Sequence, residues 1–265
     1  MATDATAAGM ISIAGRTVPR MGFGAMQLRS GESSAALAVL RRSIELGVRL
    51  IDTAWYYGKG VVNQYIADAL RPYPADLVLV TKAGASTTHD GFPPRPDYRP
   101  EELRMGNDRD RTVLGLDTVP LTHLRWMSEE DTYDGVTFDS AVDTMLAMQS
   151  EGRIEHVGLS NVTLDQLRRA HARGPIASVS NMYSYGNQTD SPTLDFCTDN
   201  GIPYLAWGPR GYGATAAPPA DRGLTAEQAR LAWLLARSPV MVVIAGTSSV
   251  KHLEENIAGG ASSWG

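Results

Sequence analysis

The stretch Val48-Arg49-Leu50-Ile51-Asp52-Thr53-Ala54-Trp55-Tyr56-Tyr57-Gly58 joins a short apolar run to a polar and aromatic segment. A short apolar run of this kind predicts a buried strand, which here ends near Asp52. A second run, Leu77-Val78-Leu79-Val80, leads in the same way into Thr81-Lys82. An acid, a phenol and an amine therefore lie at or just past the ends of two predicted buried strands.

These three groups have complementary chemistry. A phenol is a poor acid at neutral pH because its pKa lies near 10. A nearby ammonium favours the phenolate, and a carboxylate can hold that ammonium in place. We interpret Asp52, Tyr57 and Lys82 as a device that gives a proton to a carbonyl oxygen. The alternative is a buried ion pair beside a core tyrosine, although a lysine in an apolar segment is costly unless it is paired.

Composition narrows the class of protein. The 265 residues are 43% hydrophobic and 20% charged, as in ordinary globular proteins. A net charge of −5 gives no reason to expect a nucleic acid or a membrane as partner. Cys197 is the one cysteine, which excludes an internal disulfide and suits a cytoplasmic location. No apolar run approaches the ~18 residues of a membrane span, and no histidine spacing predicts a metal site. We expect a small-molecule substrate and a monomer or small homo-oligomer.

The N-terminus divides into two parts. Residues 1–9 are rich in alanine and threonine, and we expect a disordered tail rather than a signal peptide. Two short strands, at 10–13 and 17–18, flank the turn Ala14-Gly15-Arg16 and predict a β-hairpin. Residues 10–265 are expected to form a single domain.

After this hairpin, short apolar strands alternate with amphipathic helices. Strands are predicted at 21–24, 50–52, 77–82, 118–124, 156–160, 178–181, 203–206 and 241–245. Helices are predicted at 35–46, 62–70, 100–114, 140–151, 163–172, 191–200, 225–236 and 250–257. Eight such units predict an α/β fold, a (β/α)8 TIM barrel. The competing open doubly wound sheet is disfavoured because no glycine-rich dinucleotide turn follows an early strand. On the helix at 100–114, the mixed charges, including Asp110, predict a solvated face.

The motifs, in their order and spacing, resemble those of the aldo-keto reductases over most of the chain. The resemblance rests on Asp52-Thr-Ala-x-x-Tyr57-Gly58, Lys82, Gly158-Leu-Ser-Asn161 and the segment from Gly246 to Asn256. It implies a barrel that binds NADPH at its C-terminal face and transfers hydride to a carbonyl carbon, with Tyr57 as proton donor. Asp52, Tyr57 and Lys82 match three of the family's four catalytic residues.

The resemblance also implies a set of cofactor-binding positions. They are Gly24, Ala25, Met26, Ser160, Asn161, Ser180, Trp207, Gly208, Gly211, Gly246, Ser248, His252, Glu255 and Asn256. Trp207 occupies the position of an aromatic ring stacked on the nicotinamide, and Ser160 with Asn161 that of the pair bound to its carboxamide. Without the resemblance, His252 is equally interpreted as part of a solvated helix face.

The chain departs from the family pattern at several of these places. The fourth catalytic residue is normally a histidine, and by register its position is Arg125; His123 could substitute only if the strand slips by two residues or bulges. Arg125 is interpreted either as a group that polarises the carbonyl or as half of an ion pair. Ser180 replaces a glutamine, Arg210 a leucine, and Ser248 the usual arginine, which leaves NADPH versus NADH open. The seventh crossover and the C-terminal tail are short for the family, which predicts an open pocket.

The loops after the second and fourth strands carry aromatic residues. We expect Trp55, Tyr56 and Trp126 to wall the substrate site, the alternative being packing beneath a loop. The leading hypothesis for function is an NADPH-dependent oxidoreductase acting on an aldehyde or ketone. The first rival is a non-redox enzyme of secondary metabolism that uses the same acid for dehydration, isomerisation or cyclisation. A non-catalytic ligand-binding protein is the second rival.

Overall fold

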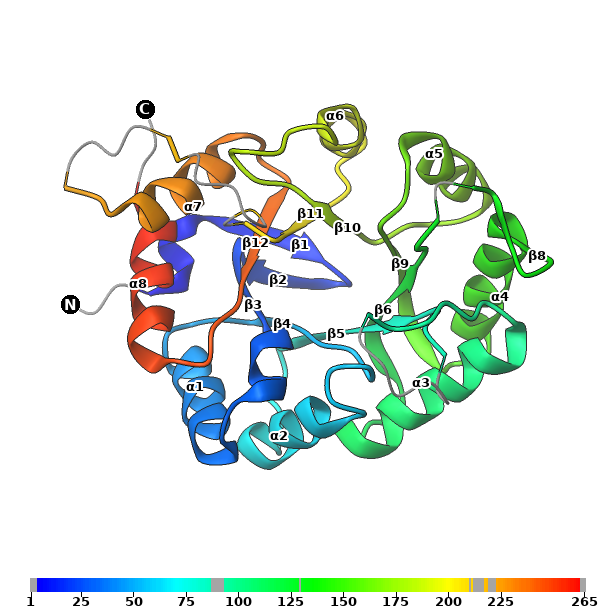
Figure 1. Cartoon of the computed structure of the whole chain (residues 1–265), viewed down its shortest axis with the longest axis horizontal. Helices are drawn as coiled ribbons and strands as arrows, with labels where there is room; N and C mark the ends of the chain where they lie inside the picture. Colours follow the sequence, from blue (N-terminus) through cyan, green and yellow to red (C-terminus); the bar gives the residue numbers. More distant parts are fainter. Residues whose placement is uncertain are drawn as a thin grey trace.

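The architecture is a closed barrel of parallel strands. The computed structural model describes residues 4–86, 93–128, 130–209, 211, 217–218 and 223–262. Within these residues, eight strands pair around the barrel in the order β10-β11-β12-β3-β4-β5-β6-β9 (Figure 1). They are β3 (Met21–Gly24), β4 (Leu50–Asp52), β5 (Val78–Ala83), β6 (Val119–Arg125), β9 (Ile154–Ser160), β10 (Val179–Met182), β11 (Tyr204–Trp207) and β12 (Met241–Ala245). The predicted (β/α)8 barrel is confirmed.

Helices cover the outside of this barrel (Figure 1). They are α1 (Ser33–Glu45), α2 (Val61–Leu70), α3 (Pro100–Leu114), α4 (Phe138–Ser150), α5 (Leu164–Arg173), α6 (Ser191–Asp199), α7 (Ala226–Ala236) and α8 (Val250–Gly260). Two of them begin with a complete capping box, Thr163 with Gln166 and Thr225 with Gln228. In each box the threonine hydroxyl accepts a hydrogen bond from the backbone N–H of the glutamine. The glutamine side-chain oxygen accepts one from the backbone N–H of the threonine.

The side chains of each strand alternate between two separate apolar cores. Leu50, Val78 and Val80 belong to a small cluster with Leu121, Leu205, Val242 and Ile244, which fills the barrel. Their strand neighbours Ile51 and Leu79 belong to the larger cluster beneath the helices. Because successive residues of a strand face opposite sides, a residue two positions beyond a barrel-filling one also faces inward. Asp52, Lys82 and Trp207 are therefore directed to the inside at the barrel's C-terminal mouth.

The N-terminal hairpin closes the opposite end of the barrel. Strand β1 (Met10–Ile13) pairs with β2 (Arg16–Pro19), and Ala14 and Gly15 form the turn with φ of 49° and 69°. Arg16 thus belongs to β2 rather than to the turn. Ile13, Ala14 and Val18 join the cluster that fills the barrel. Figure 1 shows the hairpin lying across the middle of the ring of strands.

The segment before the hairpin differs from our expectation. Ala5–Ala8 form a 3-10 helix, η1, capped by the Asp4 carboxylate, so the described residues 4–9 are not a disordered tail. The Ala5 N–H donates to the Leu46 carbonyl at 2.8 Å, and Ala5 and Ala8 are buried. The small alanine side chains allow this close packing, which composition alone does not reveal.

A second small hairpin was not predicted. Strands β7 (Thr132–Tyr133) and β8 (Val136–Thr137) pair antiparallel between β6 and α4. Each strand is two residues long, which is too short to show a periodic pattern in the sequence. The predicted thin region after Gly211 lies largely outside the described residues, as does Arg210. In the part of the chain that is described, no helix is both long and apolar enough to span a bilayer.

Candidate active site

Asp52, Tyr57 and Lys82 meet at the mouth of the barrel. The Lys82 Nζ donates to Asp52 Oδ1 at 2.6 Å, to the Thr53 carbonyl at 3.1 Å and to the Tyr57 hydroxyl at 3.3 Å. All three side chains are buried, with exposed fractions of 3%, 6% and 7% for Asp52, Tyr57 and Lys82. The three donors of the ammonium are therefore all used, and its position is fixed.

Local structure delivers each of these groups. Strand β4 ends at Asp52, and β5 carries Lys82 two positions beyond Val80, which pairs with Asp52. Tyr57 lies in the turn that follows β4, where its N–H donates to the Ala54 carbonyl at 3.0 Å. The Tyr57 carbonyl accepts from the Val62 N–H in the first turn of α2. The phenol is thus held by a turn that is hydrogen-bonded to the first turn of α2.

Burial and the Lys82 charge together set the electrostatics of Asp52 and Tyr57. Burial raises the pKa of the Asp52 carboxyl, and the Lys82 ammonium acts in the opposite direction. The ammonium, 3.3 Å from the Tyr57 oxygen, favours phenolate over phenol. Its centre also lies 5.2 Å from the Tyr57 ring centroid. This arrangement can lower the cost of taking a proton from Tyr57.

Arg125, and not His123, lies at the mouth. Both face inward from β6, but His123 comes two residues, one strand period, before Arg125 and pairs with Gly158 of β9, whereas Arg125 pairs with Ser160 at the end of β9. His123 is fully buried, and its Nε2 lies 2.7 Å from the Ser178 hydroxyl. Burial, followed by the Lys82 charge, lowers the pKa of His123 to about 3, so its ring is neutral. Strand β6 shows neither the slip nor the bulge that would bring His123 to the reacting carbonyl, so this alternative is not supported.

Arg125 borders a small open cavity. The cavity has a volume of about 260 Å³ and is lined by Arg125, Trp126, Met127, Ser128 and Asn161. The Arg125 guanidinium lies 5.2 Å from the Tyr56 ring centroid and contacts the Met127 sulfur. No carboxylate among the described residues forms an ion pair with it. The alternative interpretation of Arg125, an ion pair with an aspartate or glutamate, is therefore not observed among the described residues.

The predicted aromatic wall is only partly present. Tyr56 is half-buried, with its ring edge-on to Tyr57 at a centroid distance of 4.9 Å, and Trp55 is half-buried nearby. Trp126 is a correction, because its side chain has no exposed surface. It stacks on Tyr98 at 4.0 Å and meets Phe138 edge-on at 5.3 Å. Its strand neighbour Arg125 faces inward, so Trp126 must face the helices.

The predicted cofactor positions lie along one arc of the mouth. They occupy the ends of β9, β10, β11, β12 and β3 and the start of α8: Gly24, Ala25, Met26, Ser160, Asn161, Ser180, Trp207, Gly208, Gly211, Gly246, Ser248, His252, Glu255 and Asn256. Ala25 and Met26 begin the 3-10 helix η2 (Ala25–Ser30) directly after β3. The Trp207 indole N–H donates to the Asn161 Oδ1 at 3.2 Å, which links two of these positions. Ser248 and His252 are exposed, as an outer end of a groove requires.

Two observations test whether a dinucleotide fits this arc. The Ser180 hydroxyl is buried and has no hydrogen-bond partner within the described part of the chain, and Ser180 pairs with Ser160 at the end of β9. Helix α8 begins after Ser249, whose hydroxyl accepts from the His252 N–H. The helix therefore begins just after β12 ends at the mouth, where its dipole favours an anion such as a phosphate. The arc therefore fits the group that the sequence predicts.

Asp52, Tyr57 and Lys82, here called the triad, are backed by a buried hydrogen-bond network that the sequence did not predict. The Thr53 hydroxyl donates to Asn63 Oδ1 at 2.8 Å, and Asn63 Nδ2 donates to Asp110 Oδ1 at 2.6 Å. Asp110 is 1% exposed, so the predicted solvated face of α3 is wrong at this position. Burial raises the pKa of Asp110 to about 7. Only its position on the face that packs against α2 and β5 distinguishes Asp110 from its exposed neighbours.

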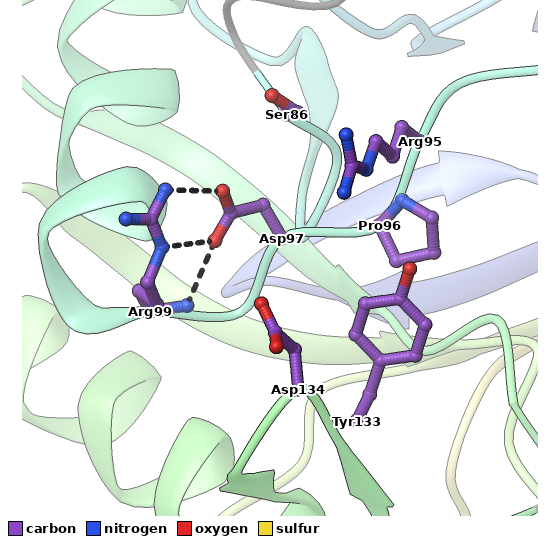
Figure 2. Close-up of a pocket in the computed structure, with 7 residues that line it drawn as sticks. All are labelled: Ser86, Arg95, Pro96, Asp97, Arg99, Tyr133 and Asp134. Carbon is purple, nitrogen blue, oxygen red and sulfur yellow. Dashed lines mark hydrogen bonds and ion pairs between the residues drawn. The ribbon is translucent and has the colours of Figure 1, made fainter.

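A larger cavity lies outside this site. It has a volume of about 650 Å³ and is lined by Ser86, Arg95, Pro96, Asp97, Arg99, Tyr133 and Asp134. Figure 2 shows Arg99 bound to the Asp97 carboxylate on one side, with Arg95 and Tyr133 on the other. None of the triad residues lines it, and neither does Arg125. Its size therefore does not make it the place where carbonyl chemistry occurs.

Comparison with known proteins places the chain in a family. The model of the Aldo/keto reductase family matches residues 20–217. A pyridoxine 4-dehydrogenase of Escherichia coli K12 is 38% identical over 257 residues, covering 92% of this chain and 90% of the relative. The chain belongs to the aldo/keto reductase family. As a member of it, the protein is an enzyme of the oxidoreductase class.

Other relatives and solved structures extend the likeness. An uncharacterized oxidoreductase of Schizosaccharomyces pombe is 34% identical, covering 97% of this chain and 86% of the relative. An aldo-keto reductase of Klebsiella pneumoniae, solved in complex with NADPH, superposes with a TM-score of 0.79 at 20% identity, covering 97% and 90% of the two chains. A glycerol dehydrogenase of Gluconobacter oxydans superposes at 0.81 and 19%, covering 97% and 91%. At these identities the two structures show a shared fold.

Proposed function

We propose that the protein is an NADPH-dependent oxidoreductase that interconverts an aldehyde or ketone with its alcohol, with Tyr57 as the proton donor. The observation that carries this proposal is the contact between the Lys82 ammonium and the Tyr57 hydroxyl at 3.3 Å, with Asp52 on the same ammonium at 2.6 Å. A structural ion pair does not need a phenol as its third member at a strand end. A carbonyl reductase needs this acid there.

The residues divide the work as follows. When bound, the reduced nicotinamide supplies the hydride that the carbonyl carbon receives. The Tyr57 hydroxyl gives its proton to the carbonyl oxygen, and the Lys82 ammonium stabilises the phenolate that remains. Asp52 holds Lys82 and balances its charge. In the alcohol-oxidising direction, the Tyr57 phenolate takes the proton back.

The cofactor proposal rests on the arc from β9 to α8. Ser160, Asn161 and Ser180 would hold the nicotinamide amide, and Trp207 would cover the ring. The start of α8 would bind the phosphate at the adenosine end. Ser248 supplies a hydroxyl and no cation there, so comparing the dissociation constants of NADPH and NADH by fluorescence titration tests the preference for NADPH.

The substrate proposal begins from a relative. The Escherichia coli relative is named for oxidation of pyridoxine at position 4. We propose that this protein acts on the same kind of compound, reducing the aldehyde pyridoxal with NADPH. We further propose a cytoplasmic location, which suits its one cysteine, Cys197, buried and free. Loss of NADPH absorbance on addition of pyridoxal measures the activity directly.

Removing the Tyr57 hydroxyl tests the proton donor. In Tyr57→Phe we expect kcat to fall by about 10²–10⁴-fold, because that is the usual contribution of a general acid. The dissociation constant for NADPH should stay within about 3-fold, since the aromatic ring remains. Steady-state kinetics and fluorescence titration give the two values.

Tyr65→Phe is the matched control. Tyr65 lies half-buried on α2, outside the barrel, and the substitution removes the same hydroxyl group as Tyr57→Phe. Its turnover should equal that of the wild type. Unchanged turnover in Tyr57→Phe would reject Tyr57 as the donor and with it the proposed mechanism.

A further inference from the structure

Arg125 leaves a positive charge unmatched at the mouth of the barrel. The Lys82 ammonium forms an ion pair with Asp52 at 2.6 Å, whereas the Arg125 guanidinium contacts the Tyr56 ring and the Met127 sulfur, and Asp52 acts on it only from a longer range. Among the described residues no carboxylate pairs with it. A guanidinium that is partly buried without an anion carries a desolvation cost, which its contact with a ring offsets only in part.

The position of Arg125 directs this charge toward the reacting carbonyl. Arg125 is on the inward face of β6, beside the strand that carries Lys82, and pairs with Ser160 on its other side. Its side chain lines the cavity of about 260 Å³ together with Asn161. The guanidinium also lies over the Tyr56 ring, which meets the Tyr57 ring edge-on, so we expect a ligand at the Tyr57 hydroxyl to lie near it.

The chemistry of the group limits what it can do there. A guanidinium stays protonated at all working pH values, so it does not act as a proton donor. It presents a planar fork of N–H groups, which matches an anionic oxygen or two adjacent oxygens. Such a group selects a substrate by its charge, in a way that a neutral histidine would not.

We propose that Arg125 binds an anionic oxygen carried by the substrate on the carbon adjoining the one that bears the carbonyl group. The preferred substrates are then aromatic aldehydes with an acidic hydroxyl ortho to the aldehyde. This rests on the proposed function, and pyridoxal has this arrangement of groups. The carbonyl oxygen meets Tyr57 while the ortho oxygen meets the guanidinium.

The test compares three small aldehydes. They are 2-hydroxybenzaldehyde, 2-methoxybenzaldehyde, in which the oxygen cannot ionise, and 4-hydroxybenzaldehyde, in which it is displaced. For the wild type we expect kcat/KM with NADPH to favour the 2-hydroxy compound over each of the others by about 10-fold or more, the effect of one charge-assisted hydrogen bond. In Arg125→Met this preference should fall to about 1.

Dividing the wild-type preference by the variant preference removes the intrinsic reactivity of each aldehyde. Arg125→Lys keeps the charge but loses the fork, and it should retain an intermediate preference. Arg168→Met is the matched control, since Arg168 also lies over an aromatic ring, Phe196, but on the outer helix α5. Its preference should equal that of the wild type.

The outcomes separate this proposal from the function on which it rests. If Arg125→Met lowers kcat/KM equally for all three aldehydes, Arg125 acts on the carbonyl alone and the proposal is overturned. If the wild type reduces no aldehyde with NADPH, the proposed function fails. Calorimetric titration of the same compounds, with and without NADP+, then decides the role of Arg125. Equal affinity of wild type and Arg125→Met for 2-hydroxybenzaldehyde overturns it, and a 10-fold or greater loss supports it.

Discussion

Gly158 and His123 depend on each other inside the barrel. They are direct partners in the register of β6 and β9, and both face inward. A Cβ added at Gly158 would overlap the His123 ring, at 2.7 Å from Nε2, and would lie 3.0 Å from the Ser178 carbonyl. The glycine is therefore required by the close approach of an imidazole, and the imidazole has space only because the glycine is there.

Gly158→Ala should lower the free energy of unfolding by about 1–3 kcal/mol, the usual cost of overpacking. The cost should be smaller when the same change is made in His123→Ala, because the ring is then absent and only the Ser178 carbonyl remains. Urea denaturation of the four proteins measures the coupling. Gly31→Ala, where nothing lies nearer than 3.8 Å to the added atom, controls for the change itself. Equal costs in both backgrounds would refute the proposed contact.

At the scale of elements, α3 packs a carboxyl group against the barrel. Asp110 is joined through Asn63 to Thr53, whose carbonyl accepts from Lys82. Its pKa in the folded protein, about 7, is above its ordinary value of 3.8. The folded state therefore binds the proton more tightly than the unfolded state. The stability this provides is fully present below pH 3.8 and is lost as the pH rises through 7.

Asp110→Asn should remove this dependence while keeping an acceptor for Asn63. The free energy of unfolding of the variant, minus that of the wild type, should rise between pH 4.5 and 7 by up to roughly 1.4 kcal/mol per pH unit. Urea denaturation at several pH values measures it. Asp117→Asn removes an exposed carboxylate and should give a flat difference. A flat difference for Asp110→Asn would mean that this group does not titrate in the range.

At the scale of the whole molecule, the N-terminal hairpin is part of the barrel core. Ile13 is 2% exposed and belongs to the same cluster as Leu50, Val78 and Leu205. The barrel strands leave this end open, and the hairpin closes it. A segment at the start of the chain therefore stabilises strands drawn from its entire length.

Ile13→Ala should reduce the free energy of unfolding by about 2–5 kcal/mol, because it leaves a cavity at the base of the barrel. Met10→Ala, three residues earlier in the same strand and 48% exposed, should change it by less than about 0.5 kcal/mol. Thermal or urea unfolding of both variants gives the comparison. Similar small effects for the two would show that the hairpin is peripheral to the core.

Local patterns predicted most of this architecture. Every barrel strand was placed within two residues of its observed ends, because a buried parallel strand is a short apolar run bounded by helix-ending and turn residues. The placement of Asp52 and Lys82 at the mouth also followed, since both come at the ends of such runs. These inferences need only a period of two or 3.6 residues, which is a property of neighbours in the chain.

Burial among distant segments was decided by tertiary structure. The sequence by itself determined the order of strands and helices and the pairing of an acid, an amine and a phenol near strand ends. Register already favoured Arg125 over His123 at the mouth, but the sequence did not show that Trp126 faces the helices or that Asp110 is enclosed. The physical reason is that exposure depends on which surfaces cover a residue, and those surfaces come from parts of the chain far apart in sequence.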